Sequence, residues 1–202
     1  MGPELLLLLA DRAGTFVFAL SGGVAAVRKE MDLFGVIMLS FLPAVGGGTL
    51  RDLLLDQPVF WLEDSVILGI AAAGGIVAFF ASNAVDNWKP LRWADAAGLA
   101  LFAVSGAAKA GDLGYGLVIM LLMGTMTATF GGLLRDVVAN RDPLVLKEDI
   151  YATAALFGAL VYALLARSPA TEAAAFAGGL AAAFLLRGAA ILFKLSLPRP
   201  RA

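Results

Sequence analysis

The chain has 202 residues, of which 60% are hydrophobic and 15% are charged, and its formal net charge is −1. A mean hydropathy of +0.87 is too apolar for an average soluble domain and indicates an integral membrane protein. The sequence contains no cysteine and no histidine, which excludes disulfides and thiolate chemistry and removes the usual general base. The absence of a basic excess gives no indication of a nucleic-acid partner.

Seven segments approach the length of about 20 mostly apolar residues that a membrane-crossing helix needs. They are residues 5–27, 33–55, 65–85, 93–108, 113–139, 150–166 and 173–193. The opening stretch MGPELLLLLADR has no basic region, and Asp11 and Arg12 interrupt its apolar run, so we expect it to belong to the first span rather than to a cleaved signal peptide. The pattern predicts an all-α fold and one membrane domain over residues 1–202.

The stretch GGGTLRD occupies residues 46–52, and its last six residues have the pattern GG-x-L-R-D. The same pattern recurs 84 positions later as GGLLRD at residues 131–136. The same shift aligns further pairs without a gap: Asp11 with Asp95, Gly14 with Gly98, Phe18 with Phe102, Ala19 with Ala103, Ser21 with Ser105 and Gly22 with Gly106. We therefore predict two three-helix repeats, over residues 11–85 and 95–167, followed by a seventh helix at 172–195. Because each repeat has an odd number of crossings, the second would enter the membrane from the opposite side.

Lysine and arginine are unevenly distributed between the two sides of the predicted spans. One side carries Arg28, Lys29, Lys89, Arg92, Arg141, Lys147, Arg199 and Arg201, and the other carries Arg12, Lys109 and Arg167. The richer side is expected to be cytoplasmic. The N-terminus would then lie outside and the C-terminus inside a prokaryotic plasma membrane.

The duplicated glycine clusters fall inside two predicted spans. Gly46, Gly47 and Gly48 form the first cluster, and Gly131 and Gly132 form the second. Successive glycines weaken a helix, so we expect a break at each cluster, tolerated in a membrane only beside protein or a water-filled path. The alternative is that these small residues serve only to let helices approach closely.

Each glycine cluster leads into an arginine and an aspartate. Adjacent residues on a helix face different directions, so we expect reciprocal pairs of Arg51 with Asp136 and of Arg135 with Asp52. In the alternative, the four charged side chains lie at the membrane interfaces and extend to water.

Further polar residues in the spans could line a path for a cation or a small solute. They are Thr15, Ser21, Ser105, Thr125, Thr127 and Thr129. Hydroxyls can equally bond to carbonyls of their own helix. Asp11 and Asp95 are candidates for attracting cations or for capping helices, and Lys109 is either a gating charge or an ordinary loop lysine.

With its twin GG-x-x-R-D motifs on two three-helix units and a seventh helix, the sequence resembles the trimeric intracellular cation (TRIC) channel family from about residue 11 to 193. The resemblance implies a homotrimer in the lipid bilayer with one pore in each protomer. That pore would be lined by the first, second, fourth and fifth helices, broken at the glycines, and would conduct monovalent cations, chiefly potassium. No cofactor, metal site or catalytic residue is implied.

The chain departs from a perfect duplication at the second motif. Phe130 stands where the first motif has Gly46, and Thr127 faces Pro43. The two breaks need not be equivalent, and Phe130 could narrow the pore. The TLRD stretch has no lysine at the first break, where animal members of the family bind a phosphoinositide, which argues against that regulation.

Two other functions remain open from the sequence. Inverted repeats with broken helices are also a transporter architecture, so a secondary transporter of a small solute such as glycine is the main alternative. Hydrolysis would require an unusual pair such as Ser105 with Lys109, so we do not expect an enzyme.

Overall fold

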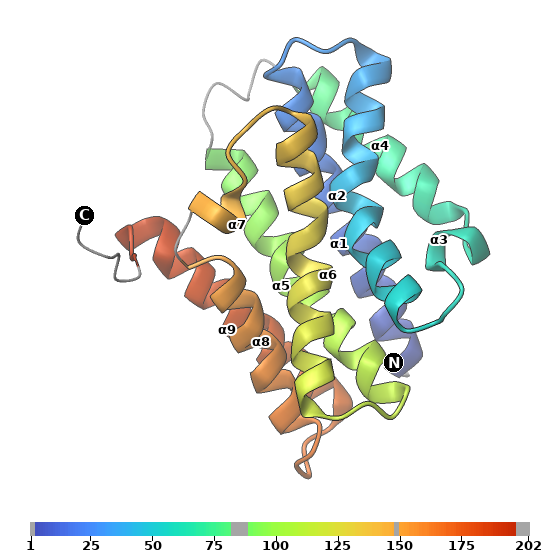
Figure 1. Cartoon of the computed structure of the whole chain (residues 1–202), viewed down its shortest axis with the longest axis vertical. Coiled ribbons are helices and arrows are strands. Elements are labelled where there is room, and N and C mark those ends of the chain that lie inside the picture. Colours follow the sequence, from blue (N-terminus) through green and yellow to red (C-terminus); the bar gives the residue numbers. More distant parts are fainter. Residues whose placement is uncertain (1–2, 82–88, 148–149, 197–202) are drawn as a thin grey trace.

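The computed structural model describes residues 3–81, 89–147 and 150–196 of the chain. These residues form nine helices (Figure 1). The helices are α1 (Pro3–Val27), α2 (Leu33–Leu54), α3 (Phe60–Glu63), α4 (Val66–Phe80), α5 (Lys89–Asp112), α6 (Leu117–Val138), α7 (Leu144–Lys147), α8 (Ala152–Leu165) and α9 (Glu172–Phe193). The described part of the chain contains no strand, and the structure is all-helical as predicted.

The seven predicted spans fall on the longer helices, α1, α2, α4, α5, α6, α8 and α9. Three of these, α2, α6 and α9, are long and apolar enough to cross a membrane, and α4 and α8 are shorter apolar helices. The end of the predicted span 65–85 lies beyond the described residues, as do Arg199 and Arg201. The short helices α3 and α7 lie in stretches that the sequence indicated as loops.

A central group of four helices is formed by α1, α2, α5 and α6. Helix α2 packs against α6 and α1, and α5 packs against α6 and α1. Helix α4 covers the α1–α2 side, and α8 and α9 cover the α5–α6 side. The central helices are therefore covered on one side by α4 and on the other by α8 and α9 (Figure 1).

Element boundaries recur at the same spacing of 84 residues as the sequence motifs. Helix α6 begins and ends 84 positions after α2, and α7 does the same relative to α3. The left-handed residues after the helices follow this spacing: Glu30 (φ 55°) matches Gly114 (φ 82°), and Asp56 (φ 52°) matches Asn140 (φ 48°). A left-handed residue allows the backbone to turn back and satisfy the last carbonyls of a helix. Both halves therefore end their helices by the same local geometry.

The glycine clusters do not break their helices. Helices α2 and α6 run without interruption through Gly46–Gly48 and through Gly131–Gly132, so the prediction of breaks was wrong. A Cβ on Gly47 would lie 2.0 Å from the Thr127 carbonyl oxygen, and one on Gly131 would lie 2.5 Å from the Pro43 carbonyl oxygen. The glycines are needed because the two backbones nearly touch where α2 and α6 cross, which is the packing alternative.

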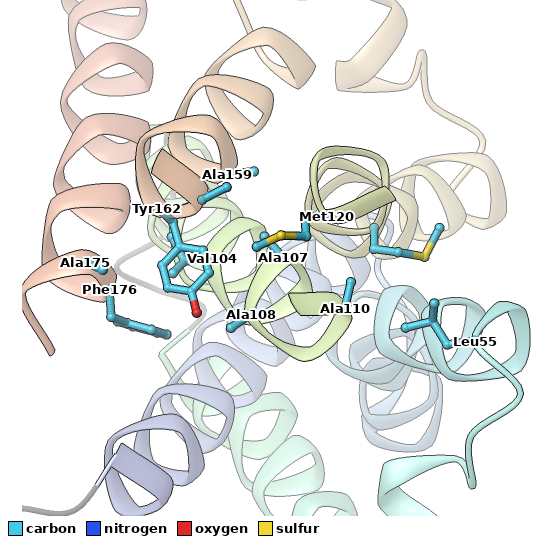
Figure 2. Packing of buried hydrophobic residues seen from close by; sticks show 12 residues of the cluster. Leu55, Val104, Ala107, Ala108, Ala110, Met120, Ala159, Tyr162, Ala175 and Phe176 are labelled. Carbon is cyan, nitrogen blue, oxygen red and sulfur yellow. The ribbon is translucent and has the colours of Figure 1, made fainter. Parts of the chain in front are cut away.

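A largely alanine-based core joins α5, α6, α8 and α9 (Figure 2). Its buried members include Val104, Ala107, Met120, Tyr162 and Phe176. The rings of Tyr162 and Phe176 meet edge to face with centroids 6.5 Å apart, and small side chains let the remaining helix pairs approach closely. This core supports one side of the central helix group.

Candidate functional site

Buried polar side chains are concentrated on the central helices. The buried ones are Thr15, Ser21, Ser40, Arg51, Asp52, Asp95, Ser105, Thr127, Thr129, Arg135, Asp136 and Arg187. Among the described residues, all of these except Arg187 of α9 lie on α1, α2, α5 or α6. Polar groups inside an apolar membrane protein are costly and usually mark a functional path.

The buried charged side chains of α2, α5 and α6 form two clusters with less buried neighbours, one cluster at each end of the α2–α6 crossing. The N-half cluster consists of Asp11, Arg51, Asp52, Ser105, Lys109 and Asp112. The C-half cluster consists of Ser21, Asp95, Arg135, Asp136 and Arg141. Each contains one of the duplicated Arg-Asp pairs.

In the C-half cluster, Arg135 is fully buried and bound on two sides. Its Nη1 donates to Asp95 Oδ1 at 2.7 Å and to the Ser21 hydroxyl, and its Nε donates to Asp136 Oδ1 at 2.9 Å. Asp95 and Asp136 are also 0% exposed. Charge-assisted hydrogen bonds of this kind offset part of the cost of burying the ions.

Asp136 also connects the helix end to the following segment. Its Oδ2 accepts a hydrogen bond from the Leu144 backbone N–H at 3.0 Å, and Arg141 Nη1 lies 3.9 Å from its Oδ1. Leu144 is the first residue of α7. The aspartate therefore holds α7 against the end of α6.

The N-half cluster repeats this connection around Asp52. Arg51 Nε donates to Asp52 Oδ1 at 2.8 Å, and the Phe60 backbone N–H at the start of α3 donates to Oδ2 at 3.0 Å. Lys109 adds a bond to Oδ1 at 2.9 Å. The Phe60 ring lies 5.7 Å below the Arg51 guanidinium carbon, a distance at which a cation and a ring attract one another.

The bridge to the aspartate on the facing helix differs between the two clusters. Asp11 and Ser105 are the residues of the N half that match Asp95 and Ser21. In the described contacts, however, Arg51 donates to Asp52 and not to Asp11 or Ser105. Among the described residues, neither Asp11 Oδ1 nor Ser105 Oγ has a hydrogen-bond partner of standard geometry. A cavity of about 230 Å³ lies here, lined by Asp11, Arg51, Ser105, Lys109 and Asp112. The N-half cluster is therefore accessible where the C-half cluster is bridged.

Two sequence predictions about the charged residues were wrong. Each arginine pairs with the aspartate next to it rather than with its counterpart in the other half, because the long guanidinium side chain can turn back through Nε. The interface alternative also fails, since Arg51 is 3% exposed and Arg135 is 0% exposed. Both are enclosed by protein rather than extended to water.

Most predicted hydroxyls bond within their own helix. Thr125, Thr127 and Thr129 donate to the backbone carbonyls of Leu121, Met123 and Thr125 at 2.8, 2.6 and 2.8 Å. Thr15 donates to the backbone carbonyl of Asp11 at 2.7 Å. Ser21 is different because it contacts Arg135 in another helix. Ser105 is also different, because it lines the cavity.

The remaining predicted site residues are the glycines, Phe130 and the two matched aspartates. Gly48 faces the Phe60 ring and Gly132 faces the Tyr151 hydroxyl, with 2.6 and 2.9 Å to an added Cβ, so neither position has room for one. Gly46 and Phe130 are only partly buried. Asp11 and Asp95 lie inside α1 and α5, so neither caps a helix.

Sequence reasoning missed three contributors. Lys109 was treated mainly as a loop residue, yet it is part of α5 and binds Asp52. The backbone N–H groups of Phe60 and Leu144 each come eight residues after their aspartate. The matching spacing of eight residues in DLLLDQPVF (52–60) and DVVANRDPL (136–144) could have been noticed, whereas the pairing of Lys109 depends on tertiary structure.

Comparisons with known proteins agree on the family. The family described as "Glycine transporter" matches this chain twice, over residues 8–83 and 92–167. The inner membrane protein YadS of Escherichia coli strain K12 is 40% identical over 200 residues, covering 96% of each chain. Its name gives a membrane location and no activity.

Solved structures add a channel family. The TRIC channel orthologue from Rhodobacter sphaeroides superimposes with a TM-score of 0.88 at 40% identity, covering 94% of this chain and 99% of that one. A crystal structure of a prokaryotic TRIC channel superimposes with a TM-score of 0.88 at 30% identity, covering 96% and 100%. The chain therefore belongs to the family whose model it matches twice, and it is a prokaryotic member of the trimeric intracellular cation channel family.

Proposed function

We propose that this protein is a potassium-permeable channel of the plasma membrane, with an ion path inside each protomer between α1, α2, α5 and α6. The observation that carries this proposal is the confinement of buried polar side chains to these four helices, apart from Arg187. Polar side chains that line a path through a membrane protein supply oxygen atoms that replace the water around an ion. The path would pass the α2–α6 crossing between the N-half and C-half clusters.

The protein architecture that we propose is seven membrane-crossing helices arranged as two inverted three-helix repeats, residues 11–85 and 95–167, and a seventh helix at 172–195. The double match of the family and the equal spacing of α2 with α6 and of α3 with α7 support it. An inverted repeat would place the N-half and C-half clusters at opposite faces of the membrane.

We also propose a homotrimer with the N-terminus outside. The trimeric name of the related channels supports the assembly, and the lysine and arginine distribution supports the orientation. Light scattering of the purified protein should give three copies per particle. The cysteine-free chain allows single-cysteine labelling with an impermeant maleimide: Tyr115→Cys should react in intact cells, and Lys29→Cys should react only after lysis.

Single-channel recording in planar bilayers under a potassium gradient tests the function. We expect discrete unitary currents that reverse near the potassium potential. Replacement of Arg51 by Gln should raise the cation conductance, because it removes a positive charge from the cavity wall while Asp52 keeps Lys109 as a partner. Arg12→Gln is the matched control at the same end, and equal conductances for the two variants would contradict the proposed path.

A secondary transporter of a small solute such as glycine is the second candidate. A cavity is present at the N-half cluster, whereas the Arg135–Asp95 bond closes the C-half cluster. A path that is open at one end and closed at the other is what an alternating-access transporter requires. A transporter would give silent bilayers and saturable uptake of the solute into vesicles. Unitary currents would exclude it.

An enzymatic activity has little support. Ser105 and Lys109 line the same cavity, but the Lys109 ammonium is bound to Asp52 rather than to the serine hydroxyl. A serine nucleophile needs a base within hydrogen-bond distance. We therefore propose that neither residue acts in hydrolysis.

A further inference from the structure

The two halves use matching residues differently. In the C half, Arg135 Nη1 lies between Asp95 Oδ1 and the Ser21 hydroxyl, and it donates to both. In the N half, the equivalent carboxylate and hydroxyl belong to Asp11 and Ser105. Both line the cavity, and neither Asp11 Oδ1 nor Ser105 Oγ has a hydrogen-bond partner among the described residues.

The unpartnered hydroxyl is not at the surface. Ser105 is 4% exposed, so its oxygen has little contact with bulk water. A buried polar oxygen without a partner is unfavourable unless water or a ligand occupies the space beside it. The cavity of about 230 Å³ provides this space, since one water molecule takes up about 30 Å³ in the liquid.

The bonding of the charged groups also differs between the two clusters. In the N-half cluster, Arg51 and Lys109 each bind Asp52 Oδ1, and Asp112 is exposed at the edge of the cavity. In the described contacts, Asp11 therefore has no directly bonded cation.

In the C-half cluster each carboxylate lies against a cation. Asp95 and Asp136 face Arg135, and Arg141 Nη1 lies 3.9 Å from Asp136. Low-dielectric surroundings penalise a carboxylate without a bonded cation, so of the two matched aspartates Asp11 is the one with room for a cation.

We propose that Asp11 and Ser105 bind one monovalent cation in this cavity, at the place that Arg135 Nη1 takes between Asp95 and Ser21 in the other half. This inference rests on the proposed cation channel and adds the residues that bind an ion at one end of its path. A divalent ion is disfavoured, because hard divalent cations use several carboxylates and the cavity wall also carries Arg51 and Lys109. The described residues include no group of three or more metal-binding side chains.

Anomalous diffraction from crystals of the full chain grown in rubidium chloride tests this site directly. A rubidium peak should lie between Asp11 and Ser105, and it should be lost in Asp11→Asn and weakened in Ser105→Ala. Asp64→Asn, on the surface at the same end, and Ser40→Ala, whose hydroxyl bonds to the Val36 carbonyl of its own helix at 2.7 Å, are the matched controls. The proposal would be overturned if no rubidium peak lay at Asp11, or if the peak were unchanged in both variants. It would also be overturned if crystals grown with barium showed a barium peak at the site while rubidium crystals showed none.

Bilayer recordings separate this inference from the channel proposal. If the site contributes to permeation, Asp11→Asn should raise the potassium concentration for half-maximal conductance by about tenfold, which corresponds to about 1.4 kcal/mol of lost binding. Normal unitary currents in a protein without a rubidium peak would contradict the proposed cation site but support the proposed channel. A rubidium peak in a protein without unitary currents would support the site and remove the channel.

Discussion

The N-half and C-half clusters share an Arg-Asp pair, a second aspartate and a serine 84 positions apart, but only in the C-half cluster does the duplicated arginine bond to that second aspartate and to the serine. Arg135 connects α6 to Asp95 on α5 and to Ser21 on α1, whereas the Nε hydrogen bond of Arg51 goes to its neighbour Asp52. The residues that are not duplicated accompany this difference. Lys109 binds Asp52, and the equivalent position in the other half is Ala25. The duplicated motif thus has similar surroundings in the two halves, and unmatched residues such as Lys109 accompany the difference in its contacts.

The largest effect should come from removing the bridging carboxylate. Asp95→Asn leaves the fully buried Arg135 with one ionised partner, Asp136, and should lower the free energy of unfolding by about 3–5 kcal/mol. Asp11→Asn, the matched change in the unbridged cluster, should alter it by less than about 1 kcal/mol, because no hydrogen bond of Asp11 Oδ1 is lost. Denaturant titration in detergent micelles measures both, and equal losses would mean that the clusters are energetically alike.

The glycines at the crossing should give the next largest effect. Gly47→Ala places a Cβ 2.0 Å from the Thr127 carbonyl oxygen, and the backbones must separate, at a cost of about 1–3 kcal/mol. Gly131→Ala meets the Pro43 carbonyl at 2.5 Å and should cost less. Gly69→Ala in α4 has nothing within 4 Å of the added Cβ and should stabilise by about 0.5–1 kcal/mol. Thermal unfolding of the three variants measures these changes in stability. Equal stability changes in Gly47→Ala and Gly69→Ala would contradict this account.

The two matched serines should differ in stability by a smaller amount. Ser21→Ala removes a hydrogen bond from the buried Arg135 and should cost about 1.5 kcal/mol. Ser105→Ala should have a smaller effect when choline replaces potassium, since among the described residues no hydrogen bond of standard geometry to this hydroxyl is lost. Unfolding of both variants in potassium and in choline chloride is the measurement. A large loss for Ser105→Ala in choline would indicate a structural role for that hydroxyl.

The sequence was sufficient to predict an all-helical fold, because helices depend on local composition and spacing. Apolar runs coincide with the seven longer helices, whereas the matched turns at Asp56 and Asn140 came to light only in the structure. Glycine composition was a poorer guide. It indicates weak helix propensity, but the close approach of the Gly47 and Thr127 backbones arises only in the packed structure, and there the helix stays continuous.

The arrangement of charges could be predicted only in part. The pattern predicted that Arg51, Asp52, Arg135 and Asp136 pair inside the helix bundle, and all four are buried, but the partner of each depends on side-chain reach and on neighbouring helices. Adjacent Arg and Asp residues pair through Nε, which helix geometry alone argued against. The contrast between a bridged Asp95 and an unpartnered Asp11 oxygen could not be read from two matching aspartates.

The smallest predicted effect concerns an ion pair found only in the N half. Arg12 Nη2 of α1 lies 3.1 Å from Asp64 Oδ2 before α4, and about a third of each side chain is exposed; the position equivalent to Arg12 in the other half is Ala96. Exposed pairs contribute about 0.2–1 kcal/mol and are screened by salt. A double-mutant cycle of Arg12→Gln and Asp64→Asn should therefore give a coupling energy in this range at low salt and close to zero at high salt. A coupling that exceeded the loss in Asp95→Asn would mean that this surface contact, rather than the buried bridge, is the main energetic difference between the two halves.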